Sequence, residues 1–411
     1  MAVIRPFLCV RPTKDKAHLV AALPYDVYSR EEAVEQVKDA PYSFLNIDRP
    51  ETQFSMDTDM YSEPVYAKAK ELLENWTLEG IFQKEEKPCY YLYELTMDGR
   101  SQTGIVTCAS IDDYENNIIK KHENTRAEKE KDRIRHVDVC NAQTGPIFLA
   151  CRKNDRLKAK ITEWKKETPI YDFTSEDGIS HRVFRIAKDE EITFLTDHFK
   201  EVNELYIADG HHRTASAVKV GKMRREQNPN YTGDEEFNYF LSVIFPEDEL
   251  KIMDYNRVVA DLNGHSVDQF LDKVGQVFQL EKKDTPVKPS KKGKIGMYLD
   301  GQWYELTYPE EKMEEDVVKR LDVSILQDKL LEPVLDIDDP KTNDRIQFVG
   351  GIRGLAELER LVGQGAAVAF SMYPTAMQEL FEVADANRLM PPKSTWFEPK
   401  LRSGLFIHEL S

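Results

Sequence analysis

The sequence lacks long hydrophobic runs and has few cysteines, and each absence excludes a class of protein. No apolar stretch reaches the ~18 residues that a membrane-spanning helix needs. The N-terminal residues lack the apolar core and cleavage site of a secretory signal. The five cysteines are odd in number and form no CxxC pair, which argues against a disulfide framework or a zinc ribbon. We therefore expect a reduced, cytoplasmic chain without a membrane partner.

Basic residues are also fewer than acidic residues. The chain has 56 Lys and Arg against 73 Asp and Glu, which gives a formal net charge of −17. Because such a chain does not attract the phosphate backbone of DNA or RNA, a nucleic-acid partner is not expected. Apolar residues make up 41% of the sequence and charged residues 31%. That mixture is typical of globular proteins with a large core.

Strand-like and helix-like segments alternate along the chain, so the expected fold class is α/β or mixed α+β. Residues 98–99 and 300–301 are both Asp-Gly, and each pair separates two apolar segments. This pattern predicts two β-hairpins. Ser29 and Thr125 each precede a Glu by three residues, which predicts a capped helix start at both places.

The length predicts about two or three domains. We expect two, one of residues 1–260 that carries the Asp-Gly-His-His-Arg segment and a C-terminal α/β domain of residues 261–411. The lysine-rich segment 282–294 contains no interleaved aromatic residues. This favours a solvated loop over a surface for single-stranded nucleic acid. The sequence contains neither a P-loop motif nor a glycine-rich dinucleotide motif that runs from a strand into a helix.

The densest group of reactive side chains is the hexapeptide 209–214, Asp-Gly-His-His-Arg-Thr. It follows the apolar segment 204–208 and precedes a predicted helix, so it forms a strand–turn–helix junction. The N–H groups and the dipole at a helix start favour phosphate. Gly210 lets the backbone approach an anion closely, and the guanidinium of Arg213 matches the geometry of phosphate oxygens.

The other side chains of the hexapeptide suit phosphoryl chemistry. Asp209 is a candidate ligand for Mg²⁺ or a base, and His211 and His212 are candidate donors to a phosphoryl group in transfer. Thr214 is a candidate nucleotide contact. The alternative is structural, with Asp209 as a helix cap and one histidine in the core. Two histidines, an arginine and an aspartate cannot all be buried cheaply, which favours a phosphate-handling site.

Two further polar segments have less specific patterns. Residues 120–125 precede a predicted helix near 126–139, and Glu123 is a candidate general base for a hydroxyl because cations stand nearby. Arg133 in that helix is a candidate nucleotide contact. The alternative is a solvated helix face with salt bridges. Residues 390–400 carry prolines and aromatics between lysines, so they form an extended segment that either lines a pocket or crosses the surface.

Four segments of the chain together resemble domain-of-unknown-function family 1015. They are residues 24–33, 120–133, 207–213 and 390–405. That family is similar to the ParB/sulfiredoxin superfamily, in which a Gly-x-x-Arg turn at a helix start binds nucleotide phosphates. Gly210 and Arg213 are the matching positions. Free-serine kinases of that superfamily carry the same Asp-Gly-His-His-Arg string.

The resemblance implies a ParB/sulfiredoxin-like nucleotide-binding core with ATP or ADP and Mg²⁺ as cofactors. It also implies a phosphotransferase whose partner is a small hydroxy compound such as L-serine. The family often has a His-Arg pair after the strand that follows the histidine motif, and here only Arg257 is present. A nucleotide-binding regulatory or assembly protein without turnover and a phosphoester hydrolase are the alternatives. The sequence leaves open whether two copies of the chain form a homodimer.

Overall fold

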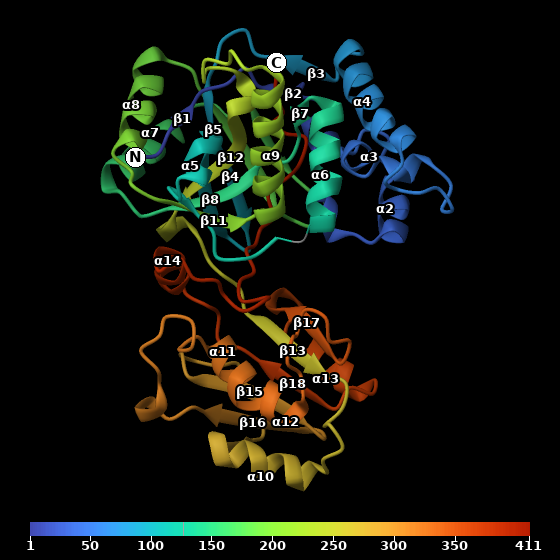
Figure 1. Cartoon of the computed structure of the whole chain (residues 1–411), viewed down its shortest axis with the longest axis vertical. Coiled ribbons are helices and arrows are strands. Elements are labelled where there is room, and N and C mark those ends of the chain that lie inside the picture. Colours follow the sequence, from blue (N-terminus) through green and yellow to red (C-terminus); the bar gives the residue numbers. More distant parts are fainter. Residues whose placement is uncertain (126) are drawn as a thin grey trace. The chain divides into compact units, whose positions relative to one another are not determined.

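The computed structural model describes residues 1–125 and 127–411. The chain divides into two compact units, which Figure 1 shows in the colours of the sequence. The first contains Met1–Leu250 and Pro399–Ser411, and the second contains Lys251–Glu398. The division expected at residue 260 differs from this one, because the last residues of the chain return to the first unit. Their backbone pairs there, Ile407 with Val10 and Ser403 with Ala22.

A mixed sheet forms the centre of the first unit. Among the described residues, its strands are, in spatial order, β6 (Ile119–Lys120), β11 (Leu205–Asp209), β8 (Ile147–Cys151), β12 (Tyr239–Pro246), β5 (Arg100–Ser110), β4 (Tyr90–Met97), β10 (Ser180–Ile186) and β9 (Tyr171–Thr174), with β1 (Ile4–Arg5) also paired to β5. β6 is parallel to β11 and β8 is parallel to β12, whereas the other neighbours are antiparallel. The mixed α/β fold class is thereby confirmed.

Helices and short strand pairs surround this sheet, with α6 and α9 side by side (Figure 1). The helices are α1 (Ala17–Val20), α2 (Arg30–Val37), α3 (Leu45–Asp48), α4 (Glu63–Leu78), α5 (Ile111–Glu115), α6 (Ala127–Cys140), α7 (Asp155–Trp164), α8 (Asp189–Lys200) and α9 (His211–Gln227). The short pairs are β2 (Val10–Pro12) with β3 (Phe82–Lys84), and β7 (Ala142–Gln143) with β19 (His408–Glu409).

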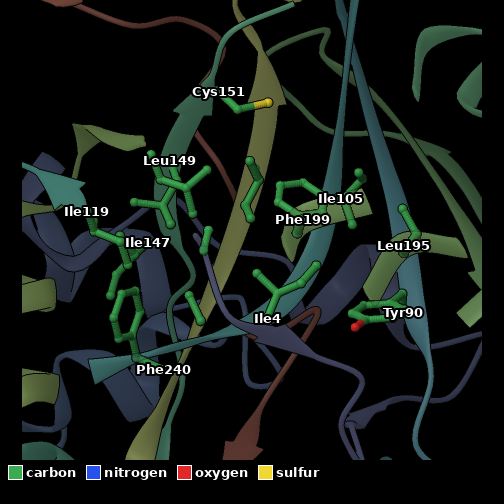
Figure 2. Packing of buried hydrophobic residues seen from close by; sticks show 14 of the residues in the cluster. Ile4, Tyr90, Ile105, Ile119, Ile147, Leu149, Cys151, Leu195, Phe199 and Phe240 are labelled. Carbon is green, nitrogen blue, oxygen red and sulfur yellow. The ribbon is translucent and has the colours of Figure 1, made fainter. Parts of the chain in front are cut away.

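The main core of the first unit lies between the sheet and α8. Figure 2 shows Ile105 of β5, Leu149 of β8 and Phe199 of α8 within this cluster. All three side chains are fully buried. Each such burial contributes about 1.5–3 kcal/mol relative to an exposed side chain. The reactive turn at residue 209 begins where β11, one strand of this sheet, leaves the core.

The second unit is built on an antiparallel sheet. Its described strands are, in order, β14 (Gln279–Lys283), β16 (Gln302–Thr307), β15 (Lys294–Leu299), β18 (Val368–Ser371), β13 (Tyr255–Val259) and β17 (Ile346–Gly350). Its helices are α10 (Val267–Val277), α11 (Asp322–Leu326), α12 (Glu332–Leu335), α13 (Leu355–Gly363) and α14 (Met377–Asp385). Within the lysine-rich segment, residues 284–293 form neither helix nor strand.

The turns and helix caps that the sequence predicts, which depend on residues close together in the chain, agree with this structure. Both Asp-Gly pairs form hairpin turns with two positive φ angles, 50° and 76° at residues 98–99 and 47° and 75° at residues 300–301. Ser29 caps α2, and both bonds of the capping box with Glu32 are present. The hydroxyl of Thr125 donates to Glu130. The side chain of Glu128, its predicted partner, lies outside the described residues.

All five cysteines are buried free thiols. Burial raises the pKa of Cys140 and of Cys151 to about 12. The thiolates that nucleophilic catalysis or metal binding would need are therefore scarce at neutral pH. Among the described residues, no helix combines the length and the apolar character needed to cross a lipid bilayer.

The return of the C-terminal segment depends on Gly404. This residue has a φ of 82°, and a Cβ atom there would collide with the ring of the fully buried Phe44. We expect Gly404→Ala to lower the free energy of unfolding by about 3 kcal/mol, from backbone strain and overpacking together. Urea denaturation measures it. The matched control is Gly80→Ala, where φ is 73° but nothing lies within 4 Å, so a cost of about 1 kcal/mol is expected. Equal costs for the two variants would contradict the collision.

Candidate functional site

The site is built on the turn between β11 and α9. Gly210 joins the two elements in the left-handed conformation, with φ 92° and ψ 31°. A Cβ atom on Gly210 would lie 3.1 Å from Nε of Arg213, so the missing side chain makes room for the guanidinium. Within the described residues, no side chain caps the start of α9, and its first turn contains no acidic residue. The positive end of the helix dipole is therefore not neutralised by a cap.

Asp209 stands immediately before this turn and is neutralised by Lys400. Its Oδ2 accepts a hydrogen bond from Lys400 Nζ at 2.7 Å, and its Oδ1 accepts the Gly210 N–H at 2.8 Å. Burial by itself would raise the pKa of the Asp209 carboxyl. Lys400 and Arg213 outweigh burial and hold that pKa below its ordinary value. The site therefore contains an ionised carboxylate whose charge is balanced by neighbouring cations.

The structure does not support Asp209 as a metal ligand. Both of its carboxylate oxygens already accept hydrogen bonds, one of them from a cation. In the described part of the chain, no group of three His, Cys, Asp or Glu side chains is arranged to hold a metal ion. Magnesium favours several oxygen ligands in octahedral geometry. We therefore assign no metal to this position and derive no chemical step from one.

The parallel pairing of β6 with β11 brings residues 120–125 beside the turn. The rings of His122 and His211 meet edge to face, with centroids 4.6 Å apart. Both side chains are buried. Burial lowers the pKa of His122 to about 4 and lowers that of His211 well below its ordinary value. At neutral pH both imidazoles are uncharged, so each carries one donor and one acceptor nitrogen.

His211 also has an unsatisfied ring nitrogen. Its Nε2 atom is buried and has no hydrogen-bond partner among the described residues. Leaving a buried polar atom unpaired costs about 1–3 kcal/mol. Such an atom at a helix start marks a position that a water molecule or a ligand would satisfy.

The remaining predicted residues occupy different positions around the turn. The Arg213 Nη1 atom donates to the Pro146 carbonyl at 2.8 Å. The Thr214 side chain is fully buried, and its hydroxyl donates to the Gly210 carbonyl at 3.0 Å. Thr214 thus stabilises the turn, and its hydroxyl is already used within α9. His212 is partly exposed in the first turn of α9, and Glu123 is partly exposed before α6.

A pocket lies beside Arg213, and Arg133 forms another part of its wall. We call it the arginine pocket; its lining includes Tyr25, Arg133, Thr144, Arg213 and Ser403. Arg133 is 7% exposed and stacks on the ring of Tyr25 at 4.0 Å. Burial alone would lower the pKa of this guanidinium, but Asp132 and Tyr25 raise it, so it stays charged. The lining also includes Asp48, and Arg133 is paired with Asp132 at 2.8 Å. Arg213, which forms no ion pair with a described residue, is therefore the cation of this pocket that suits an anion.

Sequence reasoning about the turn missed three residues that the structure places at the site. Lys400 pairs with Asp209, and Tyr25 and Ser403 line the arginine pocket. All three lie in segments 24–33 and 390–405, which carry part of the family resemblance, and residues 390–400 were also expected either to line a pocket or to cross the surface. That resemblance was the signal that could have found them. Spacing could not, because residues 25, 209 and 400 are distant along the chain.

An uncapped helix start with a left-handed glycine and nearby cations is an arrangement that often accommodates phosphate in other proteins. The chain itself belongs to the family described as "Protein of unknown function (DUF1015)", whose model matches residues 4–324. This confirms the family expected from the sequence. No curated protein matches the chain.

Several solved structures are similar to parts of this chain at low identity. A free serine kinase in complex with AMP is 12% identical, with a TM-score of 0.36, and the match covers 73% of this chain and 91% of that one. SbnI from Staphylococcus aureus, with a C-terminal truncation, is 10% identical over 72% and 85% of the chains, with a TM-score of 0.37. A conserved hypothetical protein from Pyrococcus furiosus is 13% identical over 74% and 94%, with a TM-score of 0.34. Likenesses of this degree carry no inference about ligand or activity, and the ParB/sulfiredoxin-like core stays a prediction.

The ion pair at Asp209 predicts a pH-dependent contribution to stability. Because the folded-state pKa is lowered, the stabilisation is complete above the ordinary Asp pKa of about 4 and is lost as the pH falls through the folded value. We expect Asp209→Asn to be less stable than the natural chain by about 1–2 kcal/mol at pH 6, with the difference shrinking toward pH 3. Urea denaturation at both pH values measures it. The exposed Asp39→Asn serves as control, and a difference that does not change with pH would contradict the pairing.

Proposed function

We propose that this protein binds the phosphate groups of a nucleotide at the turn 209–213 and transfers a phosphoryl group to a small hydroxy compound. One observation carries the proposal: the uncapped start of α9 coincides with a left-handed Gly210, the Arg213 guanidinium and the ammonium of Lys400. Phosphoryl transfer is achieved mainly by positioning the reactants and neutralising charge. These groups provide both at one place.

Each group has a distinct part in the proposed reaction. The backbone N–H groups at the start of α9 and the Arg213 fork bind the phosphate oxygens of the donor, which is ATP or ADP. The neutral His211 donates a hydrogen bond to a phosphate oxygen when Nε2 carries the ring proton. Lys400, already beside the turn, adds a positive charge as negative charge develops on the donor.

The transfer step itself needs a base for the acceptor. The acceptor oxygen forms a bond to the terminal phosphorus, and the bond from that phosphorus to the bridging oxygen of the donor breaks. The proton of the acceptor hydroxyl moves to the carboxylate of Glu123, which is partly exposed in the segment that β6 delivers to the turn. The resemblance of residues 209–213 to free-serine kinases makes L-serine the first acceptor to test.

We expect Arg213→Ala to weaken the binding of ADP and of ATP by at least about tenfold, because the variant loses a charge-assisted bidentate contact. Arg213→Lys should retain part of the affinity, since it keeps the charge and loses the fork. Thermal-shift titration with each nucleotide measures both. Arg360→Ala is the control, because this half-exposed residue lies on α13 and contacts Glu357. If neither nucleotide binds the natural chain at millimolar concentration, the proposal fails.

The products distinguish transfer from the two alternative functions. A phosphotransferase makes a phosphorylated acceptor from L-serine and consumes nucleotide in equal amount. A phosphoester hydrolase releases inorganic phosphate at the same rate with or without the acceptor. A regulatory or assembly protein binds nucleotide without product and changes its oligomer size, which light scattering detects.

Replacement of Glu123 tests the assignment of the base. We expect Glu123→Gln to lower the rate of phosphoryl transfer by about 100-fold or more with nucleotide affinity unchanged, because general-base catalysis typically contributes that much. Initial rates with saturating nucleotide measure it. The control is Glu79→Gln, an exposed position at the end of α4. Unchanged transfer in Glu123→Gln would assign the base elsewhere.

A further inference from the structure

The C-terminal segment that returns to the first unit carries two basic side chains, and the proposed phosphate site uses one of them. Lys400 contacts Asp209 at the turn, whereas Arg402, two residues later, contacts the loop between β9 and β10. We propose that Arg402 is a positioning residue, which holds this segment so that the ammonium of Lys400 stays beside Asp209. The inference rests on the proposed function, since it concerns a residue that acts on the phosphate site through Lys400.

Arg402 is buried and paired with a carboxylate. Its side chain is 4% exposed and forms an ion pair with Asp177, which lies in the loop between β9 and β10. The Arg402 Nη2 atom also donates to the hydroxyl oxygen of Ser175 at 3.1 Å, and that hydroxyl donates to Asp177 at 2.6 Å. Burial by itself would raise the pKa of Asp177, but Ser175 and Arg402 lower it, so the carboxylate is ionised at neutral pH. Displacing the guanidinium would leave a buried charge without its partner, which is costly.

His181 completes the surroundings of this guanidinium without adding charge. Its ring is fully buried and stacks on the rings of Tyr93 and Phe173, whose centroids lie 5.9 and 5.0 Å away. Burial and the nearby charge of Arg402 lower the pKa of His181 to about 3, so the imidazole is neutral at physiological pH. The Nε2 atom of His181 lies 3.4 Å from Nε of Arg402, and Nδ1 lies 2.8 Å from the Tyr93 hydroxyl. Several contacts with the β9–β10 hairpin therefore hold Arg402.

The two basic side chains contact parts of the sheet that are not neighbours. Asp209 is the last residue of β11, whereas Ser175 and His181 belong to the hairpin of β9 and β10. In the sheet, β8, β12, β5 and β4 lie between β11 and β10. The segment therefore connects distant strands, and two residues of extended chain span at most about 7 Å. With so little slack, a displacement of Arg402 displaces Lys400 as well.

Backbone pairing fixes the segment on the other side of Arg402. Ser403 exchanges two backbone hydrogen bonds with Ala22, at 2.9 and 3.3 Å, and Gly404 donates to the carbonyl of Thr144 at 3.2 Å. Lys400 precedes this paired stretch, and the ionic anchor at Arg402 stands between the two. Loss of the anchor lets the ammonium of Lys400 leave Asp209 for water, in which an ammonium is strongly hydrated. The Asp209 carboxylate would then repel an anion at the start of α9.

A double-mutant cycle between Asp177 and Asp209 tests the positioning without nucleotide. We expect Asp177→Asn to reduce the cost of Asp209→Asn in the free energy of unfolding by about half or more, because Lys400 no longer keeps its place. Urea denaturation at pH 6 measures this cost in both backgrounds. A merely structural contribution of Asp177 would leave the cost unchanged, since mutations at sites without shared partners are additive. The matched control is Asp172→Asn in the same hairpin, where the carboxylate faces Arg182 and the full cost of Asp209→Asn is expected.

ADP binding supplies a second readout. We expect Asp177→Asn to weaken ADP binding about threefold or more, and to have no further effect in a chain that already carries Lys400→Met, because Arg402 acts through Lys400. Thermal-shift titration with ADP measures the affinity of both single variants and of the double variant. Asp172→Asn should bind ADP as the natural chain does.

The outcomes separate this inference from the proposed function. An unchanged cost of Asp209→Asn in the Asp177→Asn chain would overturn the positioning role, whether or not ADP binds. A loss of ADP affinity that persists in full after Lys400→Met would also overturn it, since the effect would then bypass Lys400. A reduced cost of Asp209→Asn in a chain that does not bind ADP would support the positioning of Lys400 and refute the nucleotide site. If Asp177→Asn does not fold, Ser175→Ala, which removes the hydroxyl between Arg402 and Asp177, takes its place in the cycle.

Discussion

The contact between Lys400 and Asp209 is the interaction on which the site depends. A carboxylate directly before the start of α9 would repel any anion approaching the helix, and its desolvation would be costly. The ammonium of Lys400 balances that charge, and it is delivered by a segment that crosses back to the first unit through Ser403 and Ile407. The return of the C-terminal residues is therefore a condition for the electrostatics of the turn, in addition to its part in the packing around Phe44.

The net charge of −17 has a different meaning once the site is seen in three dimensions. An overall negative charge disfavours the approach of anionic ligands, whereas a local group of cations can bind them. Arg133 and Arg213 line one pocket, but Arg133 is paired with Asp132, so Arg213 is the cation of this pocket that no described carboxylate neutralises through an ion pair.

Features that depend on nearby residues could be predicted from the sequence. The Asp-Gly turns at 98–99 and 300–301 follow from the positive φ angles that these residues tolerate, and the cap at Ser29 follows from a bond spanning three residues. The strand–turn–helix junction at 209–214 was predicted for the same reason, since an apolar strand followed by glycine and a polar helix is a local pattern. The side chains within that junction were harder to assign. The Thr214 hydroxyl donates a hydrogen bond to the Gly210 carbonyl, and the Asp209 carboxylate accepts one from Lys400.

Long-range pairing explains what could not be predicted. The meeting of His122 with His211 requires β6 to lie parallel to β11, and a strand of two residues has almost no pattern of its own. The division of the chain at 250 and 399 requires the C-terminal residues to find Val10 and Ala22.

By itself, then, the sequence determined the mixed fold class, the family and the strand–turn–helix junction at 209–214, because backbone conformation and local composition suffice for these. Only the tertiary structure decided which charges are neutralised and which are left for a ligand, because the strength of an electrostatic interaction depends on distance and burial, and neither can be obtained from residue order.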